Sequence, residues 1–329
     1  MPLKKQGTKK QEVYAMTKRD AVLNFVMNGT DPGFKPAAFF LHFPEAFRSG
    51  MASVEKHIEY FRYTDMDLVK IQYEQPFPHV AGIQKPSDWA DMPFYEQDFY
   101  QGQIDAVSGL VEELGKDALV VVTLYSTFMS AVHTVGPDVL KQHLLEDPEA
   151  VCKGFEVIAE SMLVFIHQCI DSGIDGFYAS TQGGESSRFS DPRIFNDYIK
   201  PYDLLIWERI DAACDFNILH VCDYQDTYSD MKPYLDYPGE IVNCPLQLTD
   251  RSMAVSEVIE LFERPFMGGM DRHGIITKGP EEQIQNHAFD ILDANPEITI
   301  LGADCTLPPD IDWDNIKAAI GAAHTYQRE

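Results

Sequence analysis

The chain has 329 residues, of which 45% are hydrophobic, and its 52 acidic and 26 basic residues give a formal net charge of -26. Because a field of this sign repels phosphate backbones and anionic lipid headgroups, we expect no nucleic-acid partner and no membrane partner. No apolar stretch follows the charged first ten residues, and no run approaches the roughly 18 apolar residues that span a bilayer. Six scattered cysteines indicate free thiols, and together these features predict a cytoplasmic protein.

Short apolar runs alternate along the chain with longer stretches of helical spacing, which is the pattern of repeated strand–helix units. The spacing predicts a first helix over residues 18–27, within an N-terminal helical extension formed by residues 1–35. Strands are predicted at 37–42, 68–72, 118–125, 176–180, 216–220, 240–243, 265–268 and 298–302. Helices are predicted between and after them at 54–63, 101–114, 150–172, 194–213, 255–262, 280–295 and 313–326.

Eight strand–helix units in about 300 residues favour an α/β protein built as a single (β/α)8 TIM barrel that occupies residues 1–329. An open doubly wound sheet is disfavoured, because no Gly-x-Gly-x-x-Gly turn follows the first predicted strand. The stretch 74–98 contains four prolines and is too long for an ordinary turn, so we expect it to form an active-site lid or an excursion at the rim.

Polar side chains cluster where the predicted strands end, and in a barrel this face carries the active site. Two cysteines and a histidine are prominent among them, because His220 and Cys222 come at the end of the fifth predicted strand and Cys305 follows the eighth. Such a set suits Zn2+ in tetrahedral geometry with a fourth position left open. The alternative is that both cysteines are small buried side chains and that His220 is a core histidine. Their joint placement at strand ends favours the metal.

An open site of this kind has a specific chemical use. Two thiolates offset the metal charge, so a substrate thiol in the fourth position ionises but keeps enough electron density to attack carbon. The site therefore predicts the alkylation of a thiol.

Three further strand-end residues are candidate catalytic groups. Glu74 is a fourth ligand or a general base, or else a solvated rim carboxylate. Tyr125 lines the pocket or packs within the barrel. Asp271, beside His273 in a glycine-rich turn, contacts a ligand or only shapes that turn. Asp304 is expected to orient His220 or to face solvent, and His42 is a further rim candidate.

Several stretches resemble the uroporphyrinogen decarboxylase superfamily over nearly the whole chain. They are the residues 18–29, Asp175-Gly-Phe-Tyr178 with Phe189-Ser190, Tyr198-Ile-Lys-Pro-Tyr202, Leu219-His-Val-Cys222, Gly268-Gly-Met-Asp-Arg272 with Gly279-Pro-Glu-Glu282, and Asn315-Ile-Lys-Ala-Ala-Ile320. The superfamily holds porphyrinogen decarboxylases and zinc-dependent methyltransferases, including methylcobamide:coenzyme M methyltransferases. The methyltransferase branch has a His-x-Cys...Cys zinc motif, which His220, Cys222 and Cys305 match.

The resemblance implies a zinc-dependent methyltransferase that works with a corrinoid (methylcobalamin) carried by a partner protein and with a small methylated or thiol substrate. The decarboxylase branch carries an arginine pair in an Arg-Gln-Ala-Gly-Arg stretch, whereas this chain reads His42-Phe-Pro-Glu-Ala-Phe-Arg48. One arginine beside a glutamate disfavours a polycarboxylate substrate. A metal-independent decarboxylase is therefore the second hypothesis, and a non-catalytic ligand-binding barrel is the third. The sequence leaves open a homodimer, the fourth zinc ligand, both substrates and the direction of transfer.

Overall fold

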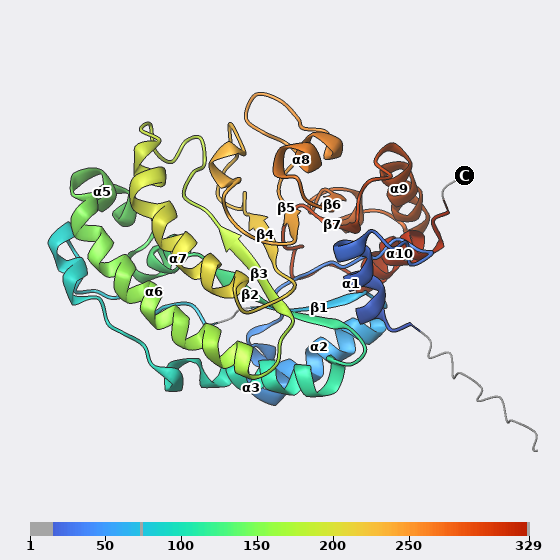
Figure 1. The fold of residues 1–329 in the computed structure, drawn as a ribbon, viewed down its shortest axis with the longest axis horizontal. Coiled ribbons are helices and arrows are strands. Elements are labelled where there is room, and N and C mark those ends of the chain that lie inside the picture. The colour runs from blue at the N-terminus through green and yellow to red at the C-terminus, as the bar shows by residue number, and fades with distance from the viewer. Residues whose placement is uncertain (1–15, 73–74, 328–329) are drawn as a thin grey trace, which may run out of the picture.

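The computed structural model describes residues 16–72 and 75–327, and these form a barrel of parallel strands surrounded by helices (Figure 1). The strands are β1 (Leu68–Ile71), β2 (Leu119–Tyr125), β3 (Gly176–Thr181), β4 (Ile218–Val221), β5 (Ile241–Asn243), β6 (Met267–Met270) and β7 (Ile300–Ala303). The helices are α1 (Lys18–Asn28), α2 (Gly50–Thr64), α3 (Gln97–Leu114), α4 (Thr127–Val135), α5 (Pro137–Glu146), α6 (Pro148–Asp171), α7 (Lys200–Asp211), α8 (Val255–Phe262), α9 (Glu281–Ala294) and α10 (Trp313–Thr325). The expected TIM-barrel class is confirmed.

The strands do not form one continuous sheet. β1 to β5 pair in chain order into a five-stranded parallel sheet, and β6 pairs with β7 in a separate two-stranded sheet. Between β5 and β6 there is one bridge, Val242 with Phe266, supported by a hydrogen bond of 2.9 Å from the Val242 N–H to the Pro265 carbonyl. We call this junction the β5–β6 seam.

The first predicted strand, residues 37–42, is an extended segment rather than a strand of the sheet. It lies between β7 and β1 and closes the barrel through bridges from Ala37 to Leu301 and from Leu41 to Leu307. Its backbone groups are partly taken by side chains, because the Ala37 N–H donates to the Asp67 carboxylate at 2.7 Å. The Tyr60 hydroxyl likewise donates to the Phe39 carbonyl at 2.8 Å. These bonds to side chains take the place of the backbone hydrogen bonds of a strand ladder. The prediction of a ladder-forming strand at residues 37–42 was therefore wrong, although the segment is extended.

Two helices were not predicted from the sequence. α4 and α5 follow β2 directly and lead into α6, with Ser126 capping α4 through a bond of 3.2 Å to the Met129 N–H. Pro137 occupies the first turn of α5, where its missing N–H costs nothing. α4 therefore begins at the mouth of the barrel and extends its wall.

The described part of the 74–98 excursion is packed against the helical layer and does not form a free lid. Trp89 is fully buried, and its indole N–H donates to His143 of α5 at 3.1 Å. Farther along, Ser161 of α6 hydrogen-bonds both the N–H and the carbonyl of Tyr95. This segment lies beside α5 and α6 in Figure 1, so α6 has a covered outer face.

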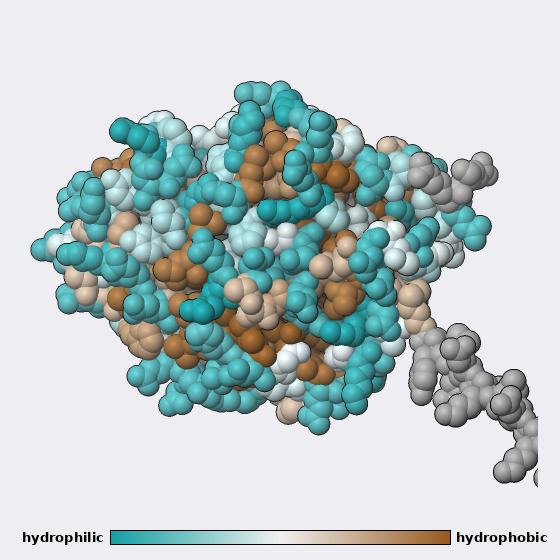
Figure 2. Space-filling model, viewed as in Figure 1, coloured by the Kyte–Doolittle hydropathy of each residue, from teal (hydrophilic) through white to brown (hydrophobic). Residues whose placement is uncertain are grey.

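The outer surface is mainly polar. Hydrophilic side chains cover most of the face shown in Figure 2, and hydrophobic patches lie between them near its lower centre. None of the described helices combines the length and the apolar character needed to cross a bilayer.

A buried carboxyl group joins α7 to the barrel. Asp203 is fully buried and accepts hydrogen bonds from the Thr181 hydroxyl at 2.8 Å and the Tyr237 hydroxyl at 3.1 Å. Burial raises its pKa to about 7, although both hydroxyl bonds act in the opposite direction.

We expect this carboxyl group to make stability depend on pH. Its folded pKa lies above the unfolded value of about 4, so its contribution is complete below about pH 4 and is lost as the pH rises through about 7. In that window the free energy of unfolding should fall by about 1.4 kcal/mol per pH unit for this one proton. Urea denaturation across the window should show that Asp203→Asn removes this slope and that Asp211→Asn, an exposed change on the same helix, keeps it. Parallel profiles for all three proteins would refute the assignment.

Candidate metal centre

His220, Cys222 and Cys305 meet at the carboxyl ends of the strands. His220 lies in β4, Cys222 directly after it, and Cys305 shortly after β7. All three are buried, with exposed fractions of 2%, 6% and 7%. The Cys222 and Cys305 sulfurs are 3.8 Å apart, and the Cys305 sulfur is 3.5 Å from His220 Nε2. One ligand atom from each residue falls within 4.8 Å of the other two.

These distances can be compared with those that a metal ion would impose. A tetrahedral zinc ion, with Zn–S bonds of about 2.3 Å and Zn–N bonds of about 2.0–2.1 Å, separates two sulfurs by about 3.8 Å and sulfur from nitrogen by about 3.5 Å. Both the Cys222–Cys305 and the Cys305–His220 distances agree with these values. The donor set could therefore hold a soft or borderline metal ion with little movement.

The contact between the two sulfurs shifts the pKa values of the two thiols in opposite directions. The pKa of Cys305 lies well below its usual range, first because the Cys222 thiol donates to it and then because of the neighbouring His220 and Arg272. The same hydrogen bond, together with burial, raises the pKa of Cys222. The Gln182 amide donates to the Cys222 sulfur at 3.2 Å. A cation bound here would displace the thiol protons, which is how metal binding and thiol ionisation are usually linked.

The imidazole of His220 packs against an aromatic ring in a tilted arrangement. Its ring lies 4.8 Å from that of Tyr178 at an interplanar angle of 32°. Nε2 faces the sulfur of Cys305, while Nδ1 is buried and makes no hydrogen bond within the described residues. Asp304, which we expected either to orient His220 or to face solvent, accepts hydrogen bonds from the backbone and the side chain of Arg272.

Asn243 fixes Tyr178 from the other side. Its side-chain oxygen accepts from the Tyr178 hydroxyl at 2.6 Å, and its amide donates to the carbonyls of Met267 at 2.9 Å and Ala303 at 3.1 Å.

Gly268 has a φ of 147°, and a Cβ there would lie 2.8 Å from the Phe266 ring. The glycine thus serves close packing inside the barrel.

A cavity of about 610 Å³ opens from the three ligand candidates to the mouth of the barrel. Its volume suits a small molecule, because ligand sites commonly measure about 300–1,000 Å³. Basic, uncharged polar, aromatic and apolar side chains line it together. They are His42, Arg48, Lys70, Gln72, Thr123, Tyr125, Met129, Val132, His133, Tyr178, Ser180, Gln182, His220, Cys222, Tyr224, Gln225, Arg272, His273, Cys305, Thr306, Leu307, Pro308 and Pro309.

The residues predicted to be catalytic lie in different surroundings. Tyr125 lines the cavity beside His133, with ring centroids 5.6 Å apart, so it stays a candidate. Glu74 lies outside the described residues. Asp271 is exposed and accepts from the backbone N–H of His273 at 2.8 Å, which is the turn arrangement that we gave as its alternative. Cys244 is buried outside the donor set.

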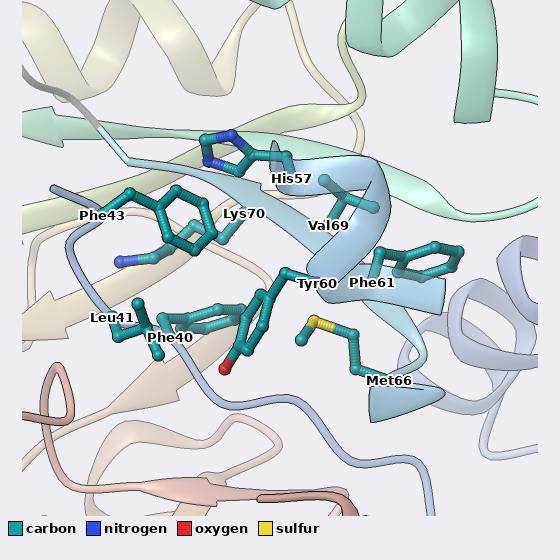
Figure 3. A pocket seen from close by; sticks show the side chains of 9 residues that line it. All are labelled: Phe40, Leu41, Phe43, His57, Tyr60, Phe61, Met66, Val69 and Lys70. Carbon is teal, nitrogen blue, oxygen red and sulfur yellow. The ribbon is translucent and has the colours of Figure 1, made fainter. Parts of the chain in front are cut away.

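Lys70 is a cavity residue that the sequence reasoning missed. It lies in the middle of β1 with an exposed fraction of 6%, and its ammonium is 4.5 Å from the centroid of the Tyr178 ring and 4.7 Å from that of Phe40. Figure 3 shows it extending beside Phe43 and Phe40. A lysine inside an otherwise apolar strand was the available signal, because charged residues are rarely buried without a specific environment.

The region drawn in Figure 3 also holds a second, much smaller cavity. Its volume of about 10 Å³ could accept one water molecule at most. Most of its walls are apolar or aromatic side chains, including Leu41, Tyr60 and Met66. It is a packing void and not a second ligand site.

Comparisons with known proteins agree with this architecture. The sequence matches the family described as uroporphyrinogen decarboxylase (URO-D) over residues 66–326. No curated protein matches it. Among solved structures, a methyltransferase from Methanosarcina mazei has a TM-score of 0.73 at 14% identity and covers 94% of this chain and 98% of its own.

Two methionine synthases are more distant structural neighbours. A B12-independent methionine synthase from Shewanella sp. W3-18-1, in complex with selenomethionine, has a TM-score of 0.55 at 10% identity over 88% of this chain and 97% of its own. A putative B12-independent methionine synthase from Listeria monocytogenes has a TM-score of 0.54 at 14% identity over 84% and 86%. At these identities the likeness concerns the fold.

We expect Asn243 to stabilise the barrel beneath the centre. Asn243→Leu would leave the Tyr178 hydroxyl and two carbonyls without this partner, so the free energy of unfolding should fall by about 3 kcal/mol, given about 1–3 kcal/mol for each buried group left unpaired. Urea denaturation measures the change. Asn286→Leu, on the exposed face of α9, is the control, and its free energy of unfolding should stay within about 0.5 kcal/mol of the parent's. An equally small change for Asn243→Leu would contradict the expectation.

Proposed function

The chain belongs to the uroporphyrinogen decarboxylase family, and from this membership and its sulfur-rich centre we propose that it is a zinc-dependent methyltransferase. His220, Cys222 and Cys305 would hold Zn2+, and the acceptor would be a small thiol bound in the cavity. The observation that carries the proposal is the donor set, because two thiolates and one imidazole at zinc-like spacing are the ligands of an open, thiol-activating site.

The proposed chemistry is a displacement at a methyl carbon. When bound, zinc would lower the pKa of the acceptor thiol, while the two cysteine thiolates neutralise the metal charge and keep the sulfur nucleophilic. The acceptor sulfur loses its proton and forms a bond to the methyl carbon. The bond from that carbon to the donor breaks, and its electron pair stays with the donor. Glu74 stays our candidate for accepting the thiol proton.

Residues around the centre support this reaction. Gln182 donates to the Cys222 sulfur, which restrains that thiolate and makes it a poorer nucleophile than the substrate sulfur. Met129, Val132 and Leu307 give the cavity apolar lining that can accommodate a methyl group and exclude water. Tyr125 also lines the cavity and would limit the size of the acceptor.

Decarboxylation of a porphyrinogen is less well supported. Arg48 lines the cavity, but its Nε donates to the Phe43 carbonyl at 2.9 Å, and Glu45 lies three residues before it in the chain. A polycarboxylate would need several bidentate cationic clamps.

We also propose that the methyl donor is a corrinoid held by a partner protein that docks over the mouth in the cytoplasm. A cobalt-bound methyl group lies within a large cofactor, so its carrier must approach the cavity closely. Tyr224 supports such a docking face, because it lines the cavity and has an exposed fraction of 69%.

The zinc proposal predicts the outcome of removing either sulfur. The purified parent should contain one zinc ion per donor set, whereas Cys222→Ser and Cys305→Ser should bind zinc about 100-fold or more weakly and lose methyl transfer. Metal analysis and chelator competition give these values. Cys152→Ser, at a half-buried cysteine outside the donor set, is the control and should behave as the parent. Absence of stoichiometric zinc, together with full activity in both serine variants, would rule the proposal out.

The donor proposal predicts a preference between two methyl sources. Thioether formation should be chelator-sensitive and should be at least 10-fold faster with a methylated corrinoid protein than with free methylcobalamin, because docking positions the donor. Carbon dioxide release from a porphyrinogen, unaffected by chelators, would instead favour the decarboxylase. Equal rates with free and protein-bound donor, and no detectable complex, would remove the partner protein from the proposal.

A further inference from the structure

The candidate metal centre is assembled across two sheets. His220 and Cys222 belong to the carboxyl end of β4 in the five-stranded sheet, and Cys305 follows β7 in the two-stranded sheet. At the β5–β6 seam the two sheets share a single bridge. The separation of the two sulfurs therefore depends on contacts other than the strand ladder.

Arg272 makes such a contact at the mouth. It lies two residues beyond β6, and its Nη1 donates to Asp223 Oδ1 at 2.7 Å and to Asp304 Oδ2 at 2.8 Å. Its backbone N–H also donates to Asp304 Oδ1 at 2.8 Å. The side chains of Arg272 and Asp223 are 11% and 12% exposed, so solvent screens this pair weakly.

The two carboxylates are neighbours of the two cysteines in the chain. Asp223 directly follows Cys222, and Asp304 directly precedes Cys305. One guanidinium thus joins the residue next to one sulfur to the residue next to the other. We propose that Arg272 is a positioning residue of the metal centre, which sets the distance between Cys222 and Cys305 by holding Asp223 and Asp304 together. The proposal rests on the zinc site put forward above.

Charge explains why a cation is needed at this place. Asp223 and Asp304 are like charges that both lie within hydrogen-bonding distance of the same nitrogen, and two thiolates would be close by. Without Arg272 the two carboxylates would repel each other in a partly buried environment, and the loops that carry them would separate. Because the loops also carry the cysteines, the sulfur spacing would widen with them.

Asn243 cannot replace this link, because it acts at a different depth. Its bonds to Met267 and Ala303 join β5 to the carbonyls of β6 and β7 inside the barrel. Arg272 joins the loops beyond the ends of β4 and β7, where the sulfurs are. Asn243 therefore stabilises the seam, and Arg272 sets the geometry of the centre above it.

The test compares the full-length parent with Arg272→Gln, Arg272→Lys and Asp223→Asn. Arg251→Gln is the matched control, because it makes the same change in an exposed ion pair with Glu257. Three quantities are measured. These are the zinc affinity by chelator competition, the thiolate-to-metal charge-transfer absorption of the cobalt(II)-substituted protein, and the rate at which diamide oxidises Cys222 and Cys305 of the metal-free protein to a disulfide, mapped by mass spectrometry.

We expect Arg272→Gln to weaken zinc binding about 10–100-fold, as loss of a residue that supports metal ligands commonly does. The cobalt charge-transfer band should lose intensity, and the disulfide should form at least 10-fold more slowly because the sulfurs are farther apart. Arg272→Lys keeps the charge and should recover at least half of the band intensity. Asp223→Asn should reproduce the direction of each change, and Arg251→Gln should match the parent.

The outcomes separate this proposal from the zinc proposal. Zinc affinity and disulfide rate equal to the parent in Arg272→Gln would overturn the positioning role and leave the zinc site standing. A parent that binds no zinc would overturn the zinc site, and the disulfide rates alone would then decide whether Arg272 holds the sulfurs together. If Arg272→Gln does not fold, Asp223→Asn decides instead, and unchanged values in that variant would overturn the role.

Discussion

The sulfur–sulfur contact between Cys222 and Cys305 is the constraint on which the candidate centre depends, because its two halves come from different sheets. A regular ladder would fix such a distance through the backbone, but the seam offers one bridge between β5 and β6. Side chains supply the remaining connections, with Asn243 inside the barrel and Arg272 at its mouth. These side-chain contacts can hold the distances within the centre even though the β5–β6 seam interrupts the sheet.

The groups around the sulfurs are arranged by charge. Two uncharged partners contact the donor set, because the Gln182 amide donates to the Cys222 sulfur and the Tyr178 ring packs against His220. The charged side chains of Asp223, Asp304 and Arg272 pair with one another. Neutral partners next to a thiolate withdraw less electron density from it than a cation would. If zinc is bound as proposed, the Gln182 amide would therefore leave the Cys222 thiolate electron-rich.

Much of this site could be predicted from sequence because strand ends in a barrel converge whatever the loops do. His220, Cys222 and Cys305 needed only correct strand positions, and these came from short apolar runs that are buried on both faces. What could not be predicted depends on contacts between distant residues. The hydrogen bond from the Ala37 N–H to Asp67 replaces a bond of the strand predicted at residues 37–42. The hydrogen bond from Trp89 to His143 holds the segment predicted as a lid or rim excursion against the helices. In the β6 turn we selected Asp271, whereas the side chain that contacts the centre's surroundings is Arg272, whose partners lie 49 and 32 residues away.

The position of α1 bears on the route by which reactants could reach the centre. The helix lies across the amino ends of β1 and β2, where the Arg19 N–H donates to the Asp117 carbonyl and Lys18 to the Met66 carbonyl, both at 2.9 Å. α1 covers the amino ends of β1 and β2 and the interior is packed, whereas the cavity opens from the centre to the carboxyl mouth. A macromolecular donor seated there would block the entry of a small acceptor. If methyl transfer proceeds as proposed above, the acceptor would have to enter before the donor docks, and the methylated product could leave only after the donor has departed.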